Sequence, residues 1–273
     1  MKRHWLLLLF PVALIVILLA TRYFSKKPSN GVEEITLAKP MAMLKDTAVV
    51  PNAPIDAVPK GNSSPQLLAP EVAEKLTVTL EKYVKENPKA PDIADAYFNL
   101  GNAYYQSGQY EKAIQPLLKA IEQHPYDADA RYTLGNTYDK LKRYQEAAQE
   151  FEAMTKIEPK NDSVYYNLGN AYSNLKDDQK AGDQYRRALS LNPKNSAAHY
   201  ALGLVYNRQQ KAREATEEFE QTVNLEPNHS EARYFLGMAK LMNGDRKGAM
   251  EQYDYLKRLN PKAADDLNKR LNP

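Results

Sequence analysis

Apolar side chains recur at helical spacing along residues 94–263, in pairs of runs that are separated by short polar turns. The turn of the first pair is Gln106–Gln109, and that of the second is Lys142–Arg143. Polar residues and glycine between two such runs indicate a turn rather than a continuing helix. The pattern therefore predicts a series of helix-turn-helix hairpins.

The hairpins repeat every 34 residues, in units 94–127, 128–161, 162–195, 196–229 and 230–263. Each unit has a Leu-Gly pair in its first run and a proline after its second run. A single hairpin cannot bury its own apolar face, so it must stack on its neighbours. The repeated glycines are Gly101, Gly135, Gly169, Gly203 and Gly237, and the closing prolines are Pro125, Pro159, Pro193, Pro227 and Pro261.

The units resemble tetratricopeptide repeats, and the resemblance covers about 170 of the 273 residues. The unit 162–195 matches the family pattern at Tyr165, Leu168, Gly169, Tyr172, Ala181, Tyr185, Ala188 and Pro193. The departures are Arg131, His199 and Arg233 in place of the first aromatic residue, Lys240 in place of Tyr, and Met154, Thr222 and Leu256 in place of Ala. The resemblance implies an all-α fold, a right-handed superhelical solenoid of about five repeats. It also implies that the first helix of each repeat lines the inner surface.

Two more helices are expected at the ends of the array. Periodic apolar residues predict a helix at Glu71–Glu86, within a leading segment of residues 71–93. Ala264–Leu271, within residues 264–273, is expected to form a helix that caps the last repeat. Polar residues at the expected starts of the first helices can accept hydrogen bonds from free backbone N–H groups. These residues are Asp92, Asp162, Ser196 and Ser230.

Residues 1–27 combine basic flanks with an uncharged run, Trp5–Ala20, which predicts a transmembrane anchor with a helix at about residues 5–24. A cleaved signal peptide is the alternative, but Leu18 is too large for position −3, the third residue before a cut after Ala20. We therefore expect a single-pass protein of the bacterial inner membrane. Its repeats are expected in the periplasm.

Residues 28–70 contain seven prolines and few aromatic residues, which indicates an extended, flexible linker. The net charge of +3 comes from the first 30 residues, which hold five basic residues and no acidic one. Residues 71–273 hold 29 basic and 30 acidic residues, so the folded part gives no electrostatic support for binding nucleic acid. The chain has no cysteine, which excludes disulfides and thiolate metal sites.

A candidate binding groove follows from two positions in the first helix of each unit. The fifth position is aromatic throughout, and the ninth, one turn further on, is asparagine in three units and apolar in two. Tyrosine offers a flat apolar face with a polar tip, and asparagine can both donate to and accept from a peptide backbone. The predicted groove residues are Phe98, Asn102, Tyr132, Asn136, Tyr166, Asn170, Tyr200, Leu204, Tyr234 and Met238.

Such a groove suits an extended or helical segment of a partner protein. Tyrosine and asparagine are also the commonest residues at these positions in the family, so their presence is equally consistent with the ancestry of the repeat. The members of the family that clamp acidic chain ends carry lysine at the fifth position. This chain has none there, so that mechanism is not expected.

The sequence gives little support for an enzyme. Its four histidines are isolated, without metal-ligand spacing or a partnered nucleophile, and no glycine-rich phosphate loop is present. We expect no catalytic residue, cofactor or metal. The predicted function is a membrane-tethered scaffold of the kind that serves cytochrome maturation, secretion or envelope assembly. Self-association through the apolar last groove and an accessory role in an enzyme complex remain alternatives.

Overall fold

The structure of the protein, a computed structural model, describes residues 70–272, which all lie in one compact unit. This part of the chain holds twelve α-helices and no strand, which confirms the prediction of an all-α fold. The helices are α3 (Pro70–Glu86), α4 (Ile93–Gln106), α5 (Tyr110–Gln123), α6 (Ala128–Lys140), α7 (Tyr144–Ile157), α8 (Asp162–Asn174), α9 (Asp178–Leu191), α10 (Ser196–Arg208), α11 (Ala212–Leu225), α12 (Ser230–Met242), α13 (Arg246–Leu259) and α14 (Pro261–Leu271).

The predicted membrane anchor in residues 1–27 lies outside the described residues, as does the predicted linker up to residue 69. No helix within residues 70–272 combines the length and the apolar character that a membrane span requires.

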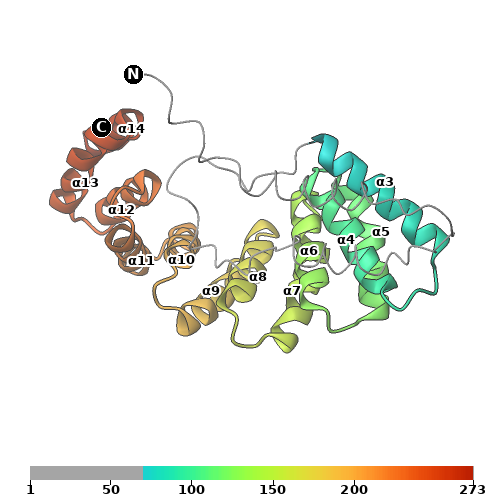
Figure 1. Cartoon of the computed structure of the whole chain (residues 1–273). Helices are drawn as coiled ribbons and strands as arrows, with labels where there is room; N and C mark the ends of the chain where they lie inside the picture. The colour runs from blue at the N-terminus through green and yellow to red at the C-terminus, as the bar shows by residue number, and fades with distance from the viewer. Residues whose placement is uncertain (1–69, 273) are drawn as a thin grey trace, which may run out of the picture. The chain divides into compact units, whose positions relative to one another are not determined.

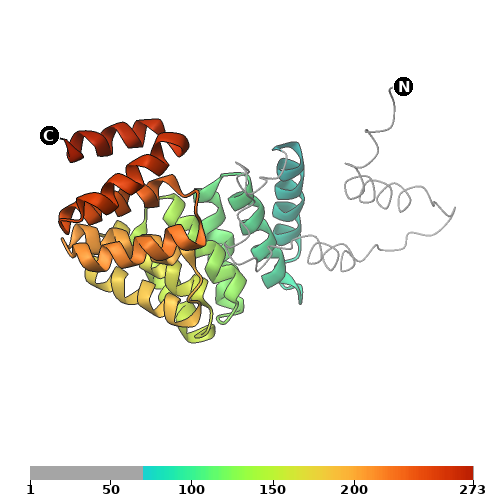
Figure 2. The ribbon, with the colours of Figure 1, turned by 90° about the vertical axis from the view of Figure 1, so that its left-hand side faces the viewer.

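Ten helices form five consecutive hairpins, from α4–α5 to α12–α13 (Figure 1). Each helix packs against the next one in the sequence, and α6 contacts α4, while α10 contacts both α8 and α12. The first helices of successive hairpins therefore form one row. At the ends, α3 packs on α4, and α14, red in Figure 2, packs on α12 and α13. This arrangement is the predicted solenoid.

The repeated glycine allows the two helices of a hairpin to approach closely. A Cβ atom on Gly169 of α8 would lie 2.6 Å from Cε1 of Tyr185 on α9, and one on Gly101 of α4 would lie 2.5 Å from Cγ of Leu117 on α5. Two carbon atoms without a bond between them do not approach so closely, so a larger side chain would push the helices apart.

The non-aromatic residues at the fourth position of the repeat tie the loop before each hairpin to its second helix. Arg131 Nε donates to the carbonyl oxygen of Pro125 at 3.0 Å, and its Nη1 donates to Glu150 at 2.7 Å. We call this pair of contacts the proline clasp. His199 makes it with Pro193 and Glu218, and Arg233 makes it with Pro227 and Gln252. The clasp explains how these side chains replace the aromatic residue of the family pattern.

The prediction of the helix caps was wrong by one residue in three helices. Asn161, Asn195 and His229 cap α8, α10 and α12, because their side chains accept from backbone N–H groups of the first turn. Asp162, Ser196 and Ser230 are instead the first helical residues. The physical reason is geometric: the capping residue must keep extended backbone angles, and the residue before each expected cap has them.

Asp92 stands at the N-cap position of α4 but makes no capping bond. Its carboxylate accepts from the hydroxyl of Tyr83 at 2.6 Å and so joins α3 to the start of the first repeat. The expected role of Asp92 as a cap is therefore also wrong.

The buried side chains are divided unevenly along the array. One large cluster extends from Leu80 of α3 to Val205 of α10. Two smaller clusters follow, one between Ala215 and Ala239 and one between Ala249 and Leu271. The N-terminal repeats thus share one continuous cluster of buried residues, which meets the next cluster through the partly buried Tyr206 of α10.

Candidate functional site

The ten predicted groove residues lie on the first helices of the five hairpins, α4, α6, α8, α10 and α12, with two on each helix. Asn102 is buried and 9% exposed, whereas the other nine are half-buried. In order along the chain they are Phe98, Asn102, Tyr132, Asn136, Tyr166, Asn170, Tyr200, Leu204, Tyr234 and Met238. Their positions are equivalent from helix to helix, while their role in binding stays a prediction.

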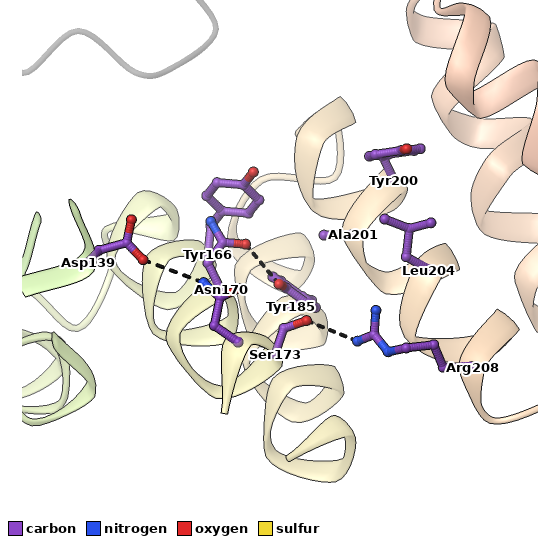
Figure 3. Close-up of a pocket in the computed structure, with 10 residues that line it drawn as sticks. Asp139, Tyr166, Asn170, Ser173, Tyr185, Tyr200, Ala201, Leu204 and Arg208 are labelled. Carbon is purple, nitrogen blue, oxygen red and sulfur yellow. Dashed lines mark hydrogen bonds between the residues drawn. The ribbon is translucent and has the colours of Figure 1, made fainter. Parts of the chain in front are cut away.

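A cavity of about 290 Å³ lies where α6, α8 and α10 meet (Figure 3). We call it the inner pocket. It brings together four of the predicted residues, Tyr166, Asn170, Tyr200 and Leu204. The other six predicted residues do not line it. The remaining lining residues are Asp139, Ser173, Asn174, Tyr185, Ala201 and Arg208.

Three of the aromatic residues at the fifth position, Tyr132, Tyr166 and Tyr200, pack against the second helix of their own hairpin. The ring centroids of Tyr132 and Phe151 lie 6.2 Å apart, and those of Tyr166 and Tyr185 lie 6.0 Å apart. Aromatic pairs at such distances stabilise a fold beyond the area that they bury. These rings therefore support the core with one part of their surface, and only the rest is free for a ligand.

The asparagines at the ninth position differ in what they do. Asn170 accepts from the hydroxyl of Tyr185 at 2.8 Å, which fixes the amide at the floor of the inner pocket (Figure 3). Burial raises the pKa of Tyr185, so this hydroxyl stays protonated and able to donate. Asn102 is buried with its Oδ1 atom unpaired. Asn102 is thus less accessible than a groove residue should be, although its oxygen has the capacity to accept a bond.

One side of the inner pocket carries an arginine that is already paired. Arg208 Nη2 donates to Asp178 Oδ1 at 2.6 Å and to Ser173 Oγ at 2.9 Å, and its Nε donates to Asp178 Oδ1 at 2.9 Å and Oδ2 at 3.2 Å. A guanidinium held by two parallel bonds to a carboxylate is fixed in place and largely neutralised. Arg208 therefore presents little net charge to the pocket.

The opposite side carries Asp139, at the end of α6. Its Oδ1 accepts from Asn174 Nδ2 at 3.5 Å, which is long for a hydrogen bond. Burial raises the pKa of this carboxyl, while the charge of Lys140 and the bond from Asn174 act against that rise. The carboxylate has lost part of its contact with water without gaining a strong partner.

Sequence reasoning missed the polar end of the inner pocket. Asp139 and Ser173 occupy the twelfth position of their units, and Asn174 and Arg208 the thirteenth. These positions lie three and four residues after the ninth, on the next turn of the same helix face. Following the face one turn further would have found them. Tyr185 is named above only as a match to the family pattern, and nothing in its position shows that its hydroxyl reaches the inner pocket.

The last two repeats have a different inner surface. Tyr200 lies against Phe219, His229 and Phe235, with ring centroids 4.8–6.3 Å apart. The hydroxyl of Tyr234 donates to Asp266 of α14, so this predicted groove residue links the last repeat to the capping helix. Within residues 70–272, no cluster of three or more His, Asp or Glu side chains is placed to hold a metal ion.

Comparisons with known proteins agree with this architecture. Models described as TPR repeat or tetratricopeptide repeat match residues 79–115, 101–142, 128–161, 163–195 and 200–264. A search of curated proteins gave no match.

Several solved structures are similar to the chain. One is YrrB, described as a TPR protein with an unusual peptide-binding site; it is 26% identical, with a TM-score of 0.60 over 71% of this chain and 99% of YrrB. MamA is 24% identical, with a TM-score of 0.58 over 66% of this chain and 94% of MamA. PilF of Pseudomonas aeruginosa is 19% identical, with a TM-score of 0.60 over 73% of this chain and 90% of PilF. The last two similarities concern the fold alone.

Proposed function

Because this chain belongs to the tetratricopeptide repeat family, we propose that it is a membrane-tethered scaffold that holds a segment of a partner protein along its row of first helices. The scaffold brings the partner into a complex at the membrane. In this proposal the protein has no catalytic activity of its own.

The inner pocket is the observation that carries the proposal. Three consecutive repeats contribute to it, and it combines aromatic rings, amide groups and a small residue, Ala201, in about 290 Å³. Concave sites with apolar walls and a few convergent polar groups are where ligands bind. YrrB, which shares the fold over most of its length, is described as having a peptide-binding site.

The membrane tether is supported by the sequence of Trp5–Ala20, an uncharged run between basic flanks. We propose an uncleaved anchor in the bacterial inner membrane, with the repeats in the periplasm. The partner then belongs to cytochrome maturation, secretion or envelope assembly. Mass spectrometry of the mature protein tests the anchor, because loss of the first 20 or so residues would show that the segment is a cleaved signal.

Site-specific photo-crosslinking tests the surface that binds the partner. A photoreactive amino acid replaces Asn136 or Leu204 in the full chain in native membranes, and two exposed residues of second helices, Gln149 and Glu217, are the matched controls. We expect a crosslinked partner from the first two positions and not from the controls. The same adduct from all four positions, or adducts from the controls alone, would contradict the proposal.

Self-association is the second candidate, and one observation favours it. Met242, Tyr255 and Leu259 near the C-terminus are large apolar residues that are 39–50% exposed. A second copy of the chain would cover them. Sedimentation of the purified full chain over a range of concentrations separates the candidates, since a scaffold for another protein stays monomeric at the concentration at which it binds its partner.

A further inference from the structure

The charges around the inner pocket do not balance. Asp139, Asp178 and Arg208 are the charged side chains that line it or pair with a residue that does. Because Arg208 is paired with Asp178, the negative charge of Asp139 has no partner of opposite charge in the pocket. Lys140 follows Asp139 in the chain, but it is exposed to solvent, where its attraction is weakened by water.

The tyrosine rings of the inner pocket also lack the Lys or Arg cation that lies over many other tyrosine rings of the protein. In residues 70–272, eight Lys or Arg cations lie over tyrosine rings, at 4.1–5.8 Å from the ring centroids. Neither Tyr166 nor Tyr200 is among those tyrosines, although the imidazole ring of His229 lies 4.8 Å from the ring of Tyr200. Both are half-buried and line the pocket (Figure 3). A cation is attracted to the face of such a ring.

We propose that the inner pocket receives a cationic side chain, arginine or lysine, of the bound segment, which pairs with the carboxylate of Asp139 and lies against the rings of Tyr166 and Tyr200. This inference rests on the proposed function, since it names the residue that the bound segment must contain. The shape of the cavity agrees with it. Ala201 leaves room between the rings for a long side chain. Asn170 Oδ1 and Ser173 Oγ already accept from Tyr185 and Arg208, and each has a second lone pair for an N–H group of the bound side chain.

Other side chains fit the inner pocket less well. An acidic side chain would meet the charge of Asp139 and would have to displace Asp178 from Arg208 to gain a partner. An aliphatic side chain would fill the space between the rings but would leave the half-desolvated Asp139 with only the long bond from Asn174. The cationic side chain satisfies both features at once.

Peptide selection on the full chain tests the inference. A library of random 12-residue peptides is selected on the purified, detergent-solubilised protein, and the peptides that cease to bind when Ala201 is replaced by Trp are retained as pocket-dependent. We expect these peptides to contain an arginine or lysine at one fixed position. Replacing that residue by norleucine, which keeps the chain length and removes the charge, should weaken binding about tenfold.

A double-mutant cycle then identifies Asp139 as the partner. Asp139→Asn should weaken binding of the basic peptide about tenfold and leave the affinity for the norleucine peptide unchanged. The norleucine peptide has already lost the charge pair with Asp139, so removing the second charge costs it nothing more. If the norleucine peptide binds to Asp139→Asn as tightly as to the wild type, the variant is also shown to be folded. Asp265→Asn makes the same change of charge on an exposed residue of α14 and should affect neither peptide.

Three outcomes would overturn the inference. Pocket-dependent peptides without a basic residue would contradict it and leave the proposed function standing. Additive losses in the cycle would show that the basic residue binds elsewhere. A selection that yields no pocket-dependent peptide would contradict the inference and the proposed function together.

Discussion

A single methyl group decides how closely two helices of a hairpin can pack. On Gly169 it would lie 2.6 Å from the ring of Tyr185, which is buried and held by its bond to Asn170. We expect Gly169→Ala to lower the free energy of unfolding by about 1–3 kcal/mol, as overpacked cores do. Urea denaturation of the purified protein measures the change.

Gly182 of α9 is the matched control for this substitution. A Cβ atom there would meet Arg186 at 3.5 Å and Val205 at 3.6 Å, which are ordinary contacts. Gly182→Ala should therefore raise the free energy of unfolding by about 0.5–1 kcal/mol, because alanine loses less backbone entropy than glycine in a helix. If both substitutions lower the free energy of unfolding, or both raise it, the prediction that a methyl group is overpacked at Gly169 but not at Gly182 is wrong.

The proline clasp of His199 should make stability depend on pH. Burial lowers the pKa of this imidazole, but the hydrogen bonds to Glu218 and Pro193 and the charge of Glu218 outweigh it, so the pKa is raised. Both ring nitrogens face acceptors, and only the imidazolium can donate to both. The stabilisation is complete below the unfolded-state pKa of about 6.5 and is lost as the pH rises through the higher folded-state value.

His199→Arg is the test, because two other repeats make the same clasp with arginine, which keeps its charge at every pH used. Melting temperatures of both proteins are compared at about pH 5 and pH 9. The wild type should lose more stability than the variant between these values, by on the order of a few degrees. Identical pH dependence would show that the clasp does not depend on protonation. Effects of the other histidines cancel in the comparison.

Some features of single residues could be predicted from the sequence and others could not. The close packing of the helices and the ends of the second helices could be predicted from the repeated glycines and prolines, because each of these residues has one physical function that tolerates few substitutes. The caps were misplaced by one residue because two polar residues stand together at each helix start, as Asn161 and Asp162 do, and either can accept the bonds. The ring of Tyr166 faces both the core and the pocket, and its position in the repeat does not reveal that division.

At the scale of helices, α14 completes the last hairpin rather than covering it loosely. In the first four hairpins the second helix supplies the side chain opposite the repeated glycine, whereas Leu267 of α14 takes that place opposite Gly237. Leu267 is fully buried together with Ala264 and Leu271. The capping helix is thus part of the core of the last repeat.

Leu267→Ala should lower the free energy of unfolding by about 2–5 kcal/mol, because it removes buried side-chain volume and leaves a cavity next to Gly237. Leu259→Ala on α13 is the control. Because Leu259 is 39% exposed, this substitution should lower the free energy of unfolding by about 1 kcal/mol or less. Thermal unfolding measures both. Equal losses would show that α14 does not stabilise the last repeat.

The start of α14 illustrates a limit of prediction for helices. The sequence pattern assigns Pro261 to the end of the fifth repeat and starts the capping helix at Ala264, but α14 begins at Pro261. Proline fits the first turn of a helix as well as it ends the previous one, because the N–H group that it lacks is unpaired there. Asn260 caps the helix by accepting from Ala263 at 3.1 Å.

At the scale of the whole repeat array, stability should vary along the chain. The large core cluster joins α3 to α10, whereas the residues of α11 to α14 belong to the two smaller clusters. Local opening needs less free energy where fewer buried contacts are lost. We expect native-state hydrogen exchange to show that α11–α14 open at a lower free energy than α5–α9. Uniform protection of both groups would mean that the array unfolds as one unit.

The fold of the array could be predicted because its evidence is repeated five times, so errors at single positions do not matter. The inner pocket could be predicted only in part, because it is formed between repeats. The bond from Asn174 to Asp139 and that from Arg208 to Ser173 each join residues 35 positions apart. Such a contact depends on the rotation between neighbouring hairpins, which no single repeat encodes.

Because the rotation between hairpins sets the shape of the inner pocket, the pocket should respond to mechanical deformation of the array. Its walls come from α6, α8 and α10, so any twisting or stretching of the array changes the width of the cavity. An occupant that touches all three helices resists such a deformation. The protein should therefore be a softer spring when empty than when loaded, and tension along the array would favour release of what it holds.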